Sequence, residues 1–192
     1  MLLLEDKPET KLDMKDWARI NRDKIGKGIH KPRFRKPKKW VIQNRILMAV
    51  MIIEDVKLSE LAAEMEVSSR TVAAWIYQGV QPTEEYRAFL SFKFGLPQSV
   101  LFYDDQMYDR VETITDKKFN KGVLSGTKIN RILTGMFAVH NLSSAEFSRI
   151  KGIAPATTRK YMHNGAYPDA QYRDIYCQYF GLPEDILFYE CL

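Results

Sequence analysis

Cysteine is scarce in this chain. Only Cys177 and Cys191 occur among its 192 residues, and no CxxC spacing is present. Two isolated thiols cannot build a disulfide framework, which excludes the class of small disulfide-stapled domains. No apolar run approaches the ~18 residues of a membrane-spanning helix, and the opening Met1–Leu4 is followed at once by acids, unlike a signal peptide. These absences predict a protein of the reducing cytoplasm that does not bind membranes.

Residue groupings that carry enzyme chemistry are also missing from the sequence. The three histidines, His30, His140 and His163, are scattered without the spacing of metal ligands. No nucleophile stands beside a base in a known motif, and there is no Gly-rich phosphate loop or paired-carboxylate motif. We therefore expect no enzymatic activity, no metal and no cofactor.

The positive charge of the chain is concentrated near its N-terminus. The net charge is +5, yet residues 1–43 carry 13 Lys and Arg against 6 Asp and Glu. The segment from Lys24 to Lys39 contains eight cations and no acid. Its two prolines disfavour a regular helix. Such a segment either binds a polyanion or stays solvated, and we interpret residues 1–39 as a basic arm that contacts phosphates.

The rest of the chain is an internal duplication. Asn44–Leu47 recurs as Asn130–Leu133, and Phe94–Pro97 recurs as Phe180–Pro183. At a constant offset of 86 positions and without a gap, 17 of the 61 residues from 44 to 104 are identical in the second copy. The sequence therefore predicts a first repeat at residues 40–104, a linker at 105–125 and a second repeat at 126–192.

Each repeat has the pattern of a compact helical domain. Val41, Ile42, Ile46 and Val50 lie on one face if residues 41–51 form a helix. Two shorter helices follow, at residues 58–65 and around 72–75, with a serine before the latter as its cap. A fourth helix opens at 82–85 and closes at Gly95, and residues 96–102 supply a fifth. The expected fold is all-α, with two tandem five-helix domains, and alternation around residues 111–115 allows a short strand in the linker.

The stretch from Val56 to Gly79 resembles the Cro/repressor (Xre-like) helix-turn-helix family. The residues that carry the resemblance are Glu60-Leu61-Ala62, Val67-Ser68, Thr71-Val72-Ala73-Ala74-Trp75 and Gly79, followed by Gly95-Leu96-Pro97 and Leu101-Phe102. The first repeat departs from the family at Glu66, which stands where glycine is usual in the turn. The second restores Gly152 but has Ser148, Lys151 and Thr158 at positions that are usually alanine or apolar.

By this resemblance, the second helix of each motif enters the major groove of DNA and reads base edges. The residues expected to contact DNA are Ser69, Arg70, Thr71, Ala73, Ala74 and Tyr77 in the first repeat, Pro155, Ala156, Thr157, Arg159, Lys160 and His163 in the second, and Lys31, Arg33, Arg35, Lys36, Lys38 and Lys39 in the arm. Arg70 is the best candidate for a bidentate guanine contact. Trp75 and Tyr161 are interpreted as core residues.

The resemblance implies a sequence-specific, double-stranded DNA-binding regulator of transcription. We expect a repressor of a phage or mobile element in the bacterial cytoplasm, associated with the nucleoid, that reads two half-sites with one chain. Two alternatives stay open. One repeat could be a protein-interaction or dimerisation module of an adaptor or anti-repressor, or the protein could be a DNA-binding accessory in replication or recombination. A homodimer or a regulatory protein partner is compatible with each of these hypotheses.

Overall fold

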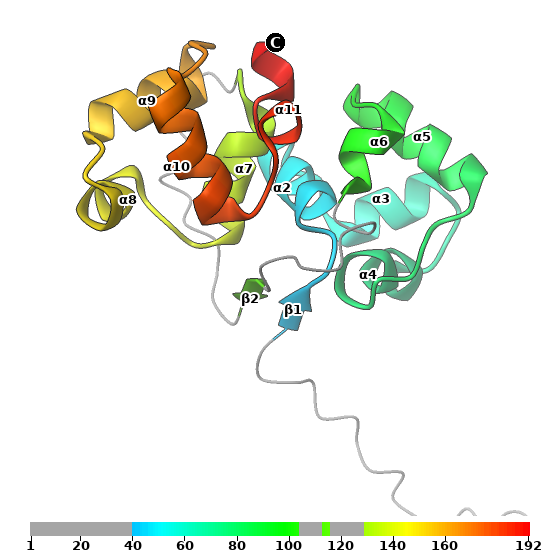
Figure 1. The fold of residues 1–192 in the computed structure, drawn as a ribbon. Helices are drawn as coiled ribbons and strands as arrows, with labels where there is room; N and C mark the ends of the chain where they lie inside the picture. The colour runs from blue at the N-terminus through cyan, green and yellow to red at the C-terminus, as the bar shows by residue number, and fades with distance from the viewer. Residues whose placement is uncertain (1–39, 104–112, 116–128) are drawn as a thin grey trace, which may run out of the picture. The chain divides into compact units, whose positions relative to one another are not determined.

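The computed structural model describes residues 40–103, 113–115 and 129–192. They belong to a compact unit, Lys38–Leu192, that is mostly helical, with ten α-helices among the described residues (Figure 1). The predicted basic arm, including Lys31 to Lys39, and most of the predicted linker lie outside the described residues. None of the helices in the described part of the chain is long and apolar enough to cross a membrane.

The helices repeat with the period of the sequence. The first repeat contains α2 (Arg45–Ile53), α3 (Leu58–Glu64), α4 (Ser69–Tyr77), α5 (Glu84–Phe94) and α6 (Gln98–Leu101). The second contains α7 (Arg131–Val139), α8 (Ser144–Lys151), α9 (Pro155–His163), α10 (Ala170–Phe180) and α11 (Glu184–Leu187), with a 3-10 turn, η3 (Tyr189–Cys191), at its end. Each helix of the second repeat begins 86 residues after its counterpart, and only α8 differs in length, by one residue.

A short strand pair precedes the first helix. β1 (Trp40–Ile42) pairs antiparallel with β2 (Thr113–Thr115), and Val41 lies opposite Ile114. The strand expected near residues 111–115 is thereby confirmed. The prediction that Val41 and Ile42 belong to the first helix is wrong, because both lie in β1 and α2 begins only at Arg45.

An asparagine sets the start of the first helix in each repeat. The Asn44 backbone is extended, and its side-chain oxygen accepts a hydrogen bond from the Leu47 amide at 2.8 Å. Asn130 caps α7 in the same way through the Leu133 amide, also at 2.8 Å. Such a cap satisfies one of the backbone donors that a helix start leaves without an intrahelical partner. The identical Asn44–Leu47 and Asn130–Leu133 segments therefore encode the same local structure.

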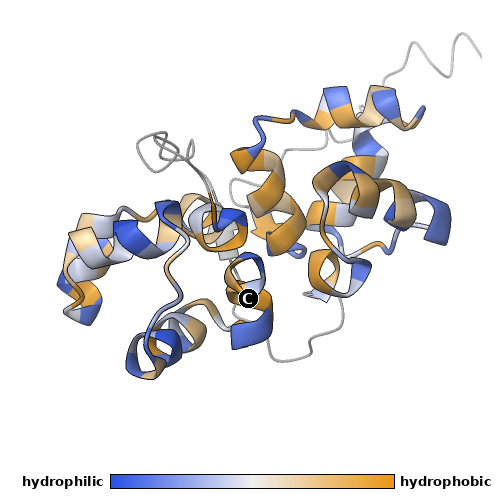
Figure 2. Cartoon of the chain, turned by 90° about the horizontal axis from the view of Figure 1, so that it is seen from above, coloured by the Kyte–Doolittle hydropathy of each residue, from blue (hydrophilic) through white to orange (hydrophobic). Residues whose placement is uncertain are grey.

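The two first helices, α2 and α7, pack against each other (Figure 1). Nearly every residue of both is buried. Elsewhere in the chain, hydrophobic and hydrophilic residues are mixed along the helices (Figure 2). Ala49 and Gly135, which are repeat equivalents, meet where α2 and α7 cross. A Cβ atom added to Gly135 would lie 2.5 Å from the Cβ of Ala49. The close approach of the helices therefore leaves room for one methyl group at this point, not two.

Two equivalent arginines tie the repeats together across this contact. Arg45 is fully buried, and its guanidinium donates a hydrogen bond to the carbonyl oxygen of Phe180 at 2.5 Å. Arg131 donates to the carboxylates of Glu190 at 2.5 Å and of Glu54 at 3.0 Å. The counterpart of Glu54 in the second repeat is His140, whose pKa is lowered to about 4 by burial and by the charge of Arg45. Arg131 thus pairs with the carboxylate of Glu54, whereas Arg45 lies near the imidazole of His140, which is neutral at pH 7.

Candidate nucleic-acid interface

Helix α4 begins at a serine cap that presents its first turn to solvent. The Ser68 hydroxyl accepts a hydrogen bond from the Thr71 amide at 3.1 Å and lies 2.8 Å from the Thr71 hydroxyl. The predicted serine cap is confirmed. The next two residues, Ser69 and Arg70, are exposed, whereas Thr71 is half-buried and already engaged by Ser68. The start of α4 therefore offers one hydroxyl and one guanidinium to a ligand.

The opposite face of α4 anchors the helix in the core. Trp75 is 3% exposed, and its ring centroid lies 5.4 Å from that of Tyr86. This confirms the interpretation of Trp75 as a core residue. Ala73 and Ala74 are half-buried at the edge of the anchored face. Tyr77 is also half-buried and packs against the core, and this desolvation raises its pKa. Most of Tyr77 is therefore committed to packing, and its contribution to an outer surface is small.

Helix α9 is built on the same plan with different chemistry. Its N-cap, Ala154, has no side-chain cap, but Pro155 occupies the first turn, where a missing N–H costs nothing. Thr158 is buried, with its hydroxyl 2.8 Å from that of Tyr176, and Tyr161 is 5% exposed. The interpretation of Tyr161 as a core residue is confirmed.

The outward positions of α9 are more basic than those of α4. Three of the predicted contact residues are exposed, namely Ala156, Arg159 and Lys160. The other three, Pro155, Thr157 and His163, are half-buried. The last turn of the preceding helix, α8, adds Arg149 and Lys151, both exposed. Lys151 also lies over the ring of Tyr179, with its Nζ atom 5.5 Å from the ring centroid.

Each of these helices follows a shorter helix across a tight turn. Helix α3 packs against α4, and α8 packs against α9. The turn after α3 places Glu66 at φ 53°, and the turn after α8 places Gly152 at φ 71°. Both values are left-handed, a conformation that glycine adopts readily and most other residues do not. The backbone geometry of the two turns is therefore alike, although only the second has the residue that suits it.

The exposed cations of both helices are available to a ligand. Within the described segments, the side chains of Arg70, Arg159 and Lys160 form no ion pair or hydrogen bond. The first repeat surrounds Arg70 with an acidic sequence, since residues 44–104 carry 5 Lys and Arg against 8 Asp and Glu. In the second repeat no acid occurs between Phe147 and Pro168. The local positive charge is consequently greater at α8 and α9 than at α4.

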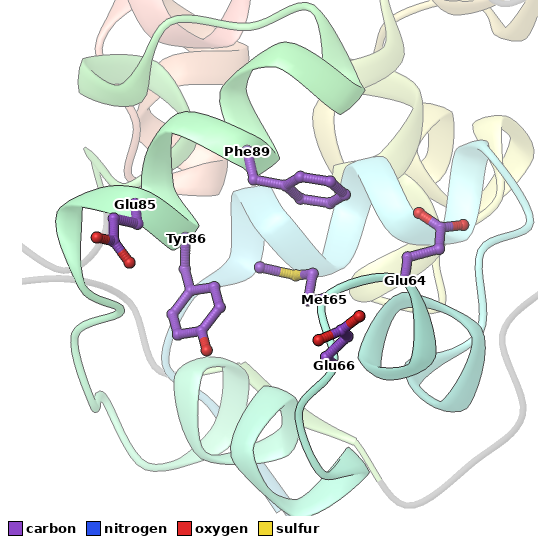
Figure 3. Close-up of a pocket in the computed structure, with 6 residues that line it drawn as sticks. All are labelled: Glu64, Met65, Glu66, Glu85, Tyr86 and Phe89. Atoms are coloured by element: carbon purple, nitrogen blue, oxygen red, sulfur yellow. The ribbon is translucent and has the colours of Figure 1, made fainter.

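A hollow of about 280 Å³ lies in the first repeat between the end of α3 and α5, and the sequence did not predict it (Figure 3). We call it the acidic hollow and define it by its lining residues, Glu64, Met65, Glu66, Glu85, Tyr86 and Phe89. The two repeats differ in sequence at the positions that line this hollow. The three glutamates correspond to Ile150, Gly152 and Gln171 in the second repeat, so the acids are a property of the first repeat alone.

Among the residues that the structure describes, no group of three or more His, Cys, Asp or Glu side chains is arranged to hold a metal ion. In comparisons with protein-family models, with curated proteins and with solved structures, nothing matches this chain. Any functional assignment therefore rests on the residues and geometry described above.

Proposed function

We propose that this protein is a sequence-specific, double-stranded DNA-binding regulator of transcription. In this proposal each repeat supplies a helix-turn-helix unit, formed by α3 and α4 in the first repeat and by α8 and α9 in the second. The observation that carries it is the duplicated arrangement of a short helix, a left-handed turn and a core-anchored helix with unpaired cations on its outer face. The family resemblance further implies a repressor of a phage or mobile element that acts by occupying promoter DNA.

The two helices are suited to different parts of the recognition. The α4 surface carries a single cation, Arg70, on the exposed first turn, where a helix in the major groove meets base edges. A guanidinium there can make two hydrogen bonds to guanine. Arg159 and Lys160 lie in a basic segment, where attraction to several phosphates outweighs the reading of one base. We therefore expect α4 to contribute specificity and α9 to contribute affinity.

The primary test is selection of bound duplexes from a randomised DNA pool with the full-length chain at about 50–100 mM salt. We expect one enriched sequence, and its affinity should fall with salt by about 0.9 log units per log unit of salt for each phosphate neutralised. Selection that enriches no sequence would refute sequence-specific binding.

Substitutions separate the roles of the two helices. Arg70→Ala should weaken binding to the selected site by about 1–3 kcal/mol and relax preference at one base pair. The double variant Arg159→Ala/Lys160→Ala should weaken binding to selected and scrambled duplexes alike and reduce the salt slope by up to about two units. Lys57→Ala/Lys93→Ala removes the same charge from the first repeat, away from α4, and is the matched control.

One repeat could instead bind a protein, and the acidic character of the first repeat favours this second candidate function for it. Its net charge over residues 44–104 is −3, whereas residues 130–192 are neutral, with 6 Lys and Arg against 6 Asp and Glu. If Arg70→Ala binds both duplexes as the unmodified chain does, the first repeat is not a DNA reader and the protein-binding role applies to it. If the double variant in α9 instead binds both duplexes as the unmodified chain does, the second repeat is not a DNA reader and the protein-binding role applies to it.

A further inference from the structure

We propose that the acidic hollow of the first repeat is a docking site for a basic segment of a partner protein, which inserts an arginine side chain between α3 and α5. This inference goes beyond DNA binding and does not depend on it, because none of the residues predicted to contact DNA lines the hollow.

Three of the six residues that line the hollow are apolar or aromatic. Met65 forms part of its surface, and the rings of Tyr86 and Phe89 line it from α5 (Figure 3). Phe89 is 37% exposed, and Phe92, three residues further along the same helix, is 89% exposed. Residues three apart are neighbours on a helix surface, so Phe92 extends the aromatic surface beyond the hollow. An aromatic ring exposed to this degree is more stable when a partner covers it.

The rim of the hollow carries negative charge that the chain leaves available. Glu64 forms an ion pair with Lys93 at 2.5 Å. The side-chain carboxylates of Glu66 and Glu85 form no ion pair or hydrogen bond within the described segments. An arginine side chain matches this combination, because its planar guanidinium stacks on aromatic rings and donates paired hydrogen bonds to carboxylates. A lysine ammonium matches less well, since it is a strongly hydrated point charge without a planar face.

The second repeat shows which of these residues the fold itself does not require. It has the same helices, yet its counterparts of Glu64, Glu66 and Glu85 carry no negative charge, and the counterpart of Met65 is Lys151. Glu66 is the most informative position, because it holds a left-handed backbone conformation that is unfavourable for a residue with a Cβ atom. The first repeat therefore keeps a carboxylate at the rim where glycine would stabilise the turn.

The experiment measures binding of a fluorescent ten-residue peptide of alternating arginine and serine to the full-length chain, with the alternating lysine peptide as comparison. The net charge of the chain is +5, so general attraction to the whole protein does not favour either peptide. We expect the arginine peptide to bind several-fold more tightly than the lysine peptide. Glu66→Gly should weaken the binding of the arginine peptide several-fold while the melting temperature stays equal or rises, which separates loss of the site from loss of the fold.

Phe89→Ser should also weaken binding of the arginine peptide, by about tenfold, because it removes a ring on which the guanidinium stacks. Ile175→Ser changes the equivalent position of the second repeat and should leave binding unchanged. Absence of binding at millimolar peptide, or equal binding by the Glu66→Gly variant, overturns the proposal. If Phe89→Ser weakens binding but Glu66→Gly and Glu85→Gln do not, the hollow accepts an uncharged apolar segment, which also overturns it. Duplex DNA is absent from the assay, so its outcome is independent of the DNA-binding proposal.

Discussion

Substituting Gly135 by alanine tests the packing of α2 against α7. In an isolated helix this change is favourable, because alanine is about 1 kcal/mol better than glycine in a helix interior. In this structure the new methyl carbon would lie 2.5 Å from the Ala49 Cβ and 2.7 Å from the Ala49 carbonyl oxygen. Both separations are far below van der Waals contact, and one of the two atoms is backbone. The two helices would therefore have to move apart.

The expected size of the effect follows from these opposing contributions. Overpacking a close-packed core costs about 1–3 kcal/mol, and a clash with backbone places Gly135→Ala near the upper end of that range. After subtraction of the propensity gain, we expect a net loss of about 2 kcal/mol in the free energy of unfolding. For a chain of this size, such a loss lowers the melting temperature by about 4–8 °C.

Thermal and urea unfolding followed by circular dichroism measure this loss. The control is the exchanged pair Ala49→Gly/Gly135→Ala, which removes the Cβ–Cβ clash but keeps the approach to the Ala49 backbone. This double variant should recover part of the stability. Measuring the single variant Ala49→Gly as well completes the cycle and gives the coupling energy of the two positions. If Gly135→Ala alone raises the free energy of unfolding by about 1 kcal/mol, the value expected from helix propensity alone, then α2 and α7 do not cross at this point.

Three further predictions address stability and the basic arm. The pKa of His140 in the folded chain lies below its value in the unfolded chain. Its contribution to the free energy of unfolding is therefore complete above about pH 6.5 and declines by up to about 3 kcal/mol toward pH 4. His140→Gln should flatten this part of a stability curve measured from pH 7 to 4.5, and an unchanged curve would contradict the lowered pKa of His140. Asn44→Ala removes the cap on the Leu47 amide and a hydrogen bond to the Leu101 carbonyl at 3.2 Å. We expect the free energy of unfolding, measured in urea, to fall by about 1–2 kcal/mol. A fall of less than about 0.5 kcal/mol would be smaller than the effect of a single cap and would contradict this role. Deleting residues 1–39 should weaken all duplexes by a similar factor and flatten the salt dependence of binding, whereas a changed sequence preference would make the arm a reader of the minor groove.

Much of the local structure could be predicted because it depends on neighbours in the sequence. The constant offset of 86 residues predicts two equivalent sets of helices, and the helices begin and end at equivalent positions in both repeats. The serine cap before α4 and the left-handed Gly95 after α5 were predicted and are confirmed, since a cap needs only the residues within one turn. The burial of Trp75 and Tyr161 was implied by the family resemblance, in which both positions belong to the core, and it is confirmed.

The candidate DNA contacts could be predicted only as a pattern. The family resemblance places Arg70, Arg159 and Lys160 at outward positions, and the structure adds that these three are exposed. It also adds that Tyr77 is largely committed to the core, because desolvation of a side chain depends on what covers it from elsewhere in the chain. DNA binding by these residues stays a prediction.

Contacts between distant residues were decided by the tertiary structure alone. Val41 looked helical by its spacing but pairs with Ile114, more than 70 positions away, and the sequence near Val41 carries no information about that strand. The burial of Arg45 against Phe180 and the approach of Gly135 to Ala49 likewise arise only when the repeats pack. Periodicity and capping act within a few residues, whereas a shared core and a surface hollow depend on which side chains from separate helices meet in space.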